Sequence, residues 1–158
     1  MFADFKGSAR RDYGIRMNGI ENSLIKNHGL LGIPMPALGE AICKIRDKCK
    51  DRASDVLLEM NRLMDKGIIT PYYIQNAQET YGLASRVSIE TEDDRDQISP
   101  MDALIVAAAA VDPKCSVLYT TDSTILTDVT LSEMIDGWRE DKGYKNLAIQ
   151  DISGIIKK

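Results

Sequence analysis

One apolar segment in the second half of the chain limits the fold most strongly. Residues 101–111 are apolar around almost the whole circumference of a helix, which is typical of a helix buried on all sides. Ser99-Pro100 favours the start of that helix and Asp112-Pro113 its end. The continuous apolar run over residues 115–119 then predicts a central strand of a parallel sheet. A core helix that leads directly into a buried strand indicates a layered α/β fold.

Helices and strands are predicted to alternate along the rest of the sequence. We predict strands over residues 1–4, 30–36, 115–119 and 146–149, and helices over residues 8–28, 37–49, 54–65, 70–82, 101–111 and 131–138, with a solvated loop at 91–97. A length of 158 residues suits one domain. We therefore expect a single domain, residues 1–158, with a three-layer α/β/α fold and a mainly parallel central sheet.

The composition is that of a globular protein without disulfides or membrane spans. The three cysteines, Cys43, Cys49 and Cys115, are odd in number and lack CxxC spacing, which favours reduced thiols over a zinc site. No apolar stretch reaches about 18 residues, and the N-terminus lacks the layout of a signal peptide. We expect a cytoplasmic protein.

The net charge of −4 and the pI of about 5.0 count against a nucleic-acid binder, because such proteins are more often basic. Two local features offset this argument. An acidic metal site would itself lower the net charge, and its cation would compensate for it. The positive charges are also clustered along the chain, namely Lys6, Arg10, Arg11 and Arg16 near the N-terminus and Lys44, Arg46, Lys48 and Lys50 after Glu40.

Several catalytic classes find no support in the sequence. The single histidine, His28, lies at a predicted helix end, where a capping or loop role is the better explanation. The sequence shows no Ser-His-Asp or Cys-His pattern and no glycine-rich phosphate loop. A second kind of phosphohydrolase, with Asp122 as the nucleophile, is disfavoured because the Asp-x-Asp-x-Thr pattern is absent.

Two aspartates are placed where α/β proteins bind their ligands. Asp122 follows the strand at 115–119, and Asp102 lies in the first turn of the helix that precedes this strand. Consecutive elements can bring both acids to the edge formed by the carboxyl ends of the strands. The spacing from Ser99 to Asp102 fits a capping box equally well. Asp122 is harder to explain as a cap, although residues 120–123 could form an Asx-type turn.

Two further acids precede them. Glu40 follows Pro36 in a predicted early helical turn, where acids are favourable in any case, and Asp4 ends the predicted first strand. Clustered carboxylates repel one another unless they are protonated or bound to metal, and Mg²⁺ and Mn²⁺ prefer oxygen ligands. Such a site suits hydrolysis of a phosphodiester, because the metal activates water and no nucleophilic side chain is needed.

The segments around these acids resemble PIN domains, of which the VapC-type toxins of prokaryotes are the most abundant members. Residues 98–110 and 116–123 resemble the C-terminal half of the family, and residues 33–40 resemble the segment around its glutamate. The resemblance implies that Asp4, Glu40, Asp102 and Asp122 hold Mg²⁺ or Mn²⁺ and that the chain is an endoribonuclease acting on RNA. It also implies a homodimer and, for a toxin, a small antitoxin protein as partner.

The sequence departs from the family pattern after Asp4. Phe5-Lys6-Gly7-Ser8 stands where the family has Thr or Ser followed by Asn or Ser, so a supporting hydroxyl is missing or displaced to Ser8. This leaves a catalytically weakened PIN-fold module, acting in RNA binding or assembly, as the alternative. Thr121 and Ser123 are candidates to support the metal ligands. Lys6, Arg10 and Arg11 are candidate phosphate contacts or plain surface charges.

Overall fold

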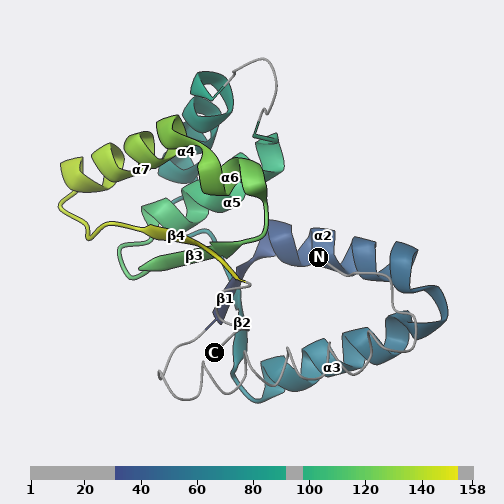
Figure 1. Ribbon diagram of the computed structural model, residues 1–158. Coiled ribbons are helices and arrows are strands. Elements are labelled where there is room, and N and C mark those ends of the chain that lie inside the picture. The colour runs from purple at the N-terminus through teal and green to yellow at the C-terminus, as the bar shows by residue number, and fades with distance from the viewer. Residues whose placement is uncertain (1–30, 92–97, 153–158) are drawn as a thin grey trace. The chain divides into compact units, whose positions relative to one another are not determined.

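A computed structural model describes residues 31–91 and 98–152 of the chain, which forms two compact units (Figure 1). Of the described residues, 31–73 belong to unit 1, and 74–91 and 98–152 belong to unit 2. The strand predicted at 1–4 and the helix predicted at 8–28 lie outside the described residues, as does almost all of the loop predicted at 91–97.

Unit 1 is a helical hairpin on a pair of short strands. Its elements are β1 (Leu31–Pro34), α2 (Met35–Cys49), the 3-10 helix η1 (Lys50–Arg52), α3 (Ala53–Asp65) and β2 (Ile69–Tyr72). The two strands are parallel, with Leu31 opposite Ile69 and Pro34 opposite Tyr72. The helices predicted at 37–49 and 54–65 are thus confirmed, with starts one or two residues earlier. The strand predicted at 30–36 is also confirmed, but its residues are half-buried or exposed and not fully buried.

The helix predicted to begin at Thr70-Pro71 is wrong. These residues belong to β2, and the helix begins only at Ala77. The residue before a proline is biased towards extended backbone, and pairing with β1 favours the same conformation. Proline is tolerated here because β2 has β1 as its only neighbour in the described sheets. The side chain of Asn76 caps the true helix start by accepting a hydrogen bond from the Glu79 N–H at 3.2 Å.

Unit 2 alternates helices with a second pair of parallel strands. Its elements are α4 (Ala77–Glu90), α5 (Pro100–Val111), β3 (Val117–Thr120), α6 (Ser123–Thr127), α7 (Val129–Asp141) and β4 (Ala148–Asp151). Val117 lies opposite Ala148, and Thr120 lies opposite Asp151. The turn between α5 and β3 is tight, so the strand runs back along the helix (Figure 1). The beginning of α5 and the carboxyl end of β3 therefore lie at the same end of unit 2.

Helix α5 forms the centre of the unit 2 core, as the sequence predicts. Ala103, Val106 and Ala107 are completely buried, and the small alanine side chains let α4 pack closely against this helix. The rest of the core comes from the other elements and the loops that join them, chiefly Leu83, Val87, Ile98, Ile125, Leu131, Ile135 and Leu147. Full burial of each such side chain stabilises the fold by about 1.5–3 kcal/mol.

Arg139 on α7 is a completely buried cation, which no local pattern in the sequence predicts. Its guanidinium donates hydrogen bonds to the carbonyl oxygens of Ala110 (2.8 Å), Asp112 (3.1 Å) and Cys115 (3.0 Å), and its Nε donates to the carbonyl of Lys145. The last carbonyls of a helix have no partner within the helix and carry partial negative charge. Arg139 therefore ties the end of α5, the start of β3 and the segment before β4 together.

The mixed α/β class with parallel strand pairs between helices is confirmed. The described strands form two separate two-stranded sheets, β1–β2 and β3–β4. Their combination into one central sheet, and the folding of residues 1–158 as one domain, remain predictions. Across residues 31–91 and 98–152, every helix is too short or too polar to cross a membrane.

Candidate functional site

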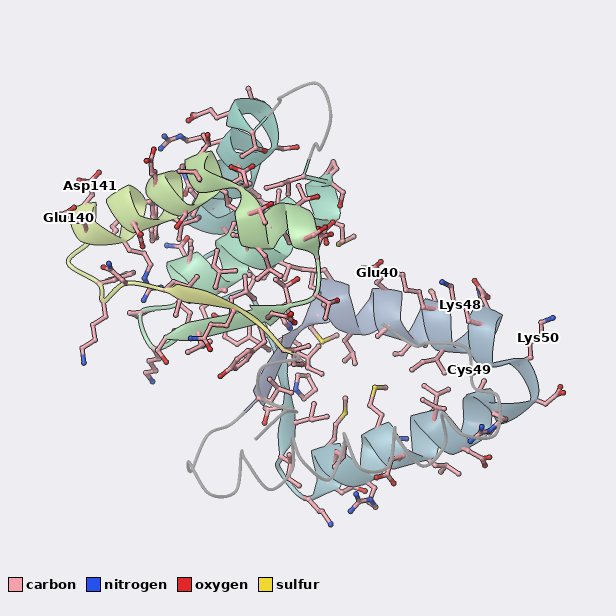
Figure 2. The ribbon with its side chains drawn as sticks, in the orientation of Figure 1. Glu40, Lys48, Cys49, Lys50, Glu140 and Asp141 are labelled. Carbon is pink, nitrogen blue, oxygen red and sulfur yellow. The ribbon has the colours of Figure 1, made fainter. Side chains whose placement is uncertain are left out.

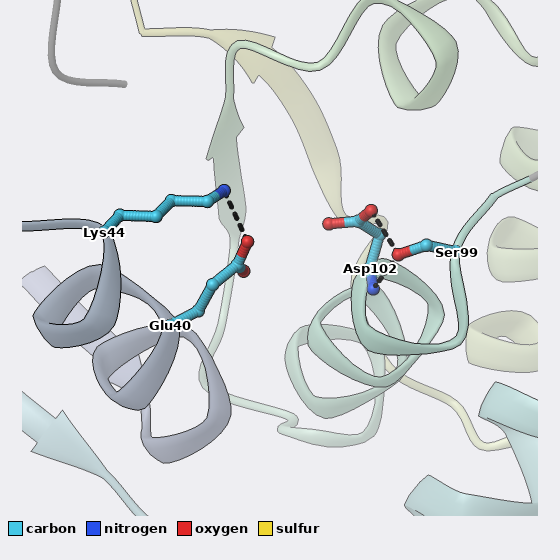
Figure 3. A network of polar contacts seen from close by, with 4 residues as sticks. All are labelled: Glu40, Lys44, Ser99 and Asp102. Carbon is cyan, nitrogen blue, oxygen red and sulfur yellow. Dashed lines mark hydrogen bonds and ion pairs between the residues drawn. The ribbon is translucent and has the colours of Figure 1, made fainter. Parts of the chain in front are cut away.

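Asp102 lies in the first turn of α5, where Ser99 is the N-cap and Pro100 the first helical residue. The Ser99 hydroxyl accepts a hydrogen bond from the Asp102 N–H at 3.2 Å and donates one to Oδ2 of the Asp102 carboxylate at 2.6 Å (Figure 3). The serine cap expected from the Ser99–Asp102 spacing is thus present, but the Asp102 carboxylate accepts from the Ser99 hydroxyl and not from a backbone N–H, as a capping box would require. Only one carboxylate oxygen takes part in this contact, and the other points away from Ser99 (Figure 3).

Asp122 is the N-cap of the short helix α6, so the expectation that it is hard to explain as a cap is wrong, whereas an Asx-type turn, the alternative left open for this segment, is present. Its Oδ1 accepts a hydrogen bond from the Thr124 N–H at 2.8 Å. Its own N–H donates to the Thr120 hydroxyl at 3.1 Å, which fixes the turn that leaves β3. The sequence did not predict this role, because α6 has only five residues and no clear helical pattern.

The fold brings Asp102 and Asp122 to one end of unit 2. Asp102 begins α5, and Asp122 follows the carboxyl end of β3, which runs back along that helix. Asp151 belongs to the same end, because it is the last residue of β4 and lies opposite Thr120. The predicted strand at 146–149 ended too early to include Asp151. The sequence signal that could have found it is an acid two residues after the apolar pair Ala148-Ile149, at the end of a strand. We call this the acidic end of unit 2: Asp102, Asp122 and Asp151.

Glu40 lies in unit 1, whereas Asp102 and Asp122 lie in unit 2. Helix α2 begins at Met35, two residues earlier than predicted, and its first turn holds no acid. The explanation of Glu40 as an acid in an initial helical turn is therefore wrong. Glu40 is in the second turn, half-buried, and forms an ion pair with Lys44 one turn further along (Figure 3). Asp4, the fourth predicted ligand, lies outside the described residues, as do His28, Lys6, Arg10 and Arg11.

Within 31–91 and 98–152, no three His, Cys, Asp or Glu side chains lie close enough together to hold a metal ion. Asp102 and Asp122 have the carboxylate chemistry that Mg²⁺ and Mn²⁺ prefer. A complete site of the predicted kind also needs Glu40 or Asp4, which the described part of unit 2 does not contain.

The three thiols, Cys43, Cys49 and Cys115, are free. Burial raises the pKa of the Cys115 thiol, and the nearby Asp112 carboxylate raises it further. Its Sγ lies 3.6 Å from the carbonyl oxygen of Val117, at the opposite end of β3 from Asp122. A thiol held protonated in this way is a poor nucleophile, because the thiolate is the reactive form.

Comparisons of the chain with models of known protein families, with curated proteins and with solved structures found no match.

Proposed function

We propose that the chain is a Mg²⁺- or Mn²⁺-dependent endoribonuclease with a three-layer PIN fold, in which Asp4, Glu40, Asp102 and Asp122 hold the metal. The proposal is carried by the shared position of Asp102 and Asp122 at one end of unit 2. Ligands of parallel α/β sheets bind beyond the carboxyl ends of the strands, and Asp122 directly follows such an end. The PIN resemblance of residues 98–123 favours the same two acids.

The capping hydrogen bonds are compatible with metal binding. A carboxylate has about four lone-pair sites on its two oxygens. Asp102 uses Oδ2 towards Ser99, and Asp122 uses Oδ1 towards Thr124, so each retains an oxygen for a cation. Hydrogen bonds of this kind fix the orientation of a metal ligand, so the side chain loses less conformational entropy when the metal binds. Ser99 and the Thr124 N–H are then positioning groups for the two aspartates.

The ion pair of Glu40 is a weak competitor of metal binding by its carboxylate. Its partner Lys44 is half-exposed, with a side-chain exposure of 50%, and exposed ion pairs contribute only about 0–1 kcal/mol. A divalent cation therefore competes easily with the Lys44 ammonium for the Glu40 carboxylate. The ion pair keeps the carboxylate charged and oriented when metal is absent.

The reaction we propose is hydrolysis of a phosphodiester bond in RNA. Water adds to phosphorus, the bond from phosphorus to the leaving oxygen breaks, and a proton passes to that oxygen. The bound divalent cation supplies Lewis-acid stabilisation of the phosphoryl charge. Asp102 and Asp122 would hold the cation, and the proton that the water loses is balanced by the proton that the leaving oxygen gains. The PIN resemblance extends the proposal to a homodimer and to a small antitoxin partner, as in a toxin–antitoxin pair.

Incubation of the full chain with a mixed RNA pool and Mn²⁺ tests the proposal. Asp102→Asn and Asp122→Asn each remove a charge but keep an oxygen for the capping bond, so the fold is retained. We expect both to reduce cleavage by about a hundredfold or more, because even residues that only support a ligand affect activity 10–100-fold.

Asp112→Asn is the matched control. Asp112 accepts a hydrogen bond from the Lys114 N–H at 2.8 Å, the same local bond that Asp122 forms with Thr124, but at the opposite end of β3. This variant should cut RNA as the parent does. Equal cleavage by parent, Asp102→Asn and Asp122→Asn would assign the activity to a contaminant or another site.

A module that binds RNA without cutting it is the second candidate. The observation that favours it is that each carboxylate has a local partner without a metal: Asp102 accepts from the Ser99 hydroxyl, and Asp122 accepts from the Thr124 N–H. The departure after Asp4 points in the same direction. In that case, the chain binds RNA in the presence of a chelator, and adding Mn²⁺ neither cuts the RNA nor changes the binding.

A further inference from the structure

Residues 44–52 carry a concentration of positive charge in an acidic chain. The segment holds five basic and two acidic residues, whereas the whole chain has a net charge of −4. Its basic residues are Lys44, Arg46, Lys48, Lys50 and Arg52. It spans the end of α2, the 3-10 helix η1 and the bend towards α3. We call residues 44–52 the basic tip of unit 1.

Two lysines of the basic tip are available for a ligand. Lys44 pairs with Glu40, and Arg46 pairs with Asp47 at 2.9 Å. Lys48 and Lys50 are exposed, and neither forms an ion pair within the part of the chain that the structure describes. Figure 2 shows Lys48 on the last turn of α2 and Lys50 at the bend that follows, with both side chains directed outward.

The backbone at Lys50 gives a second, independent reason to assign a role to its side chain. Lys50 has φ of +40°, in the left-handed region that favours glycine. The other two described residues with positive φ are Gly67 after α3 and Gly143 after α7. Two helices are thus followed by glycine, which adopts positive φ without strain, whereas α2 is followed by a lysine. The helix dipole explains a cation in the last turn, such as Lys48, but not a strained lysine beyond it.

The surface of the basic tip fits a polyanion better than a folded protein partner. Protein interfaces are depleted in lysine and have aromatic or apolar centres. The basic tip contains no aromatic side chain and no large exposed apolar side chain. Lysine ammonium groups are point charges on flexible stems, which suits the phosphates of a flexible strand.

We propose that Lys48 and Lys50 bind the phosphodiester backbone of single-stranded RNA. The choice of RNA as the polyanion rests on the proposed function. Contacts with phosphates release counterions, so each contact adds roughly 0.7 to the slope of log affinity against log salt for a single strand. Two contacts therefore contribute about 1.4 to that slope.

The test measures binding of the full chain to a fluorescent single-stranded RNA of mixed sequence over a series of KCl concentrations. A chelator is present, so the RNA is not cut. In Lys48→Gln/Lys50→Gln we expect weaker binding and a slope less steep by about 1.4. Glutamine at position 50 has the same backbone strain as lysine, so the variant changes charge alone. Lys48→Arg/Lys50→Arg should restore the slope.

Lys114→Gln/Lys145→Gln is the matched control, because it removes the same charge from two exposed lysines of unit 2. It should leave the slope close to that of the parent. Equal losses in the two double variants would overturn the proposal, as would a parent that does not bind RNA. A parallel titration with polyglutamate tests for an acidic protein partner. If Lys48→Gln/Lys50→Gln loses binding to polyglutamate but keeps the RNA binding of the parent, the basic tip binds an acidic protein and the proposal is overturned. Failure of the nuclease proposal is distinct, since RNA binding would then depend on Lys48 and Lys50 without any metal-dependent cleavage.

Discussion

The two ends of unit 2 use their polar groups in opposite ways. Where α5 finishes and β3 begins, the buried Arg139 satisfies the carbonyl oxygens of Ala110, Asp112 and Cys115. At the acidic end, where α5 begins and β3 finishes, the polar groups are carboxylates. Asp102 is half-buried and Asp122 is exposed, and each has one oxygen in a capping bond.

The difference separates a structural role from the metal-binding role that we propose for the acidic end. A buried cation surrounded by carbonyl oxygens holds elements in place and is shielded from ligands. Carboxylates near the surface contribute less to stability but can exchange partners, which a metal site requires. Loss of Arg139 should therefore affect folding, and loss of the acids should affect metal binding.

Arg139→Met should have the largest effect on stability. The substitution leaves several buried carbonyl groups without a partner, each at a cost of about 1–3 kcal/mol, so we expect roughly 3–5 kcal/mol of destabilisation. Urea unfolding measures this loss. Arg86→Met is the control, since Arg86 forms an exposed ion pair with Glu90 on α4. Equal stability of the two variants would show that the hydrogen bonds of Arg139 do not hold these segments together.

Ser99→Ala should separate stability from activity at the acidic end. Loss of this N-cap destabilises the fold by about 1 kcal/mol and frees the Asp102 carboxylate from its orienting bond. Asn76→Ala removes the cap of α4, which accepts a hydrogen bond of the same length, 3.2 Å, from Glu79.

Both variants should lose similar stability in thermal unfolding, and only Ser99→Ala should also lose Mn²⁺-dependent RNA cleavage. A similar loss of cleavage in Ser99→Ala and Asn76→Ala would show that Ser99 stabilises the fold and does not orient Asp102 for activity.

The smallest expected effect is a pH dependence at the Arg139 end. The raised pKa of Cys115 means that the folded state keeps the thiol proton to higher pH than the unfolded state. Its contribution to stability is complete below the usual thiol pKa of about 8.5 and is lost as the pH rises through the higher folded pKa. Unfolding midpoints from neutral to alkaline pH should fall less steeply in Cys115→Ala than in the parent. Cys43→Ala, which changes an exposed thiol, should follow the parent.

The elements of unit 2 could be predicted from the sequence because their signals are local. The apolar helix over residues 101–111, its stop at Asp112-Pro113 and the strand that follows are all found within one or two residues of the predicted bounds. The Ser99–Asp102 capping contact was also visible in the spacing. These features depend on periodicity and on residues three apart, which the sequence contains directly.

The wrong predictions depend on long-range partners. Thr70-Pro71 has the pattern of a helix start, but pairing with β1 makes it a strand. The burial of Arg139 depends on carbonyl groups 24 to 29 residues away, and no local pattern reports these. The association of Asp151 with the acidic end likewise depends on the register between β3 and β4.

The central claim is that the acidic end of unit 2 binds a divalent cation, and the shift of the thermal unfolding midpoint with added Mn²⁺ tests it most directly. Mn²⁺ stabilises a folded state that binds it by an amount that grows with the ratio of free metal to Kd. The parent and Asp112→Asn should show the same increase in midpoint, while Asp102→Asn and Asp122→Asn should show little or none. An unchanged midpoint in the parent, or an equal increase in all four proteins, would contradict the claim.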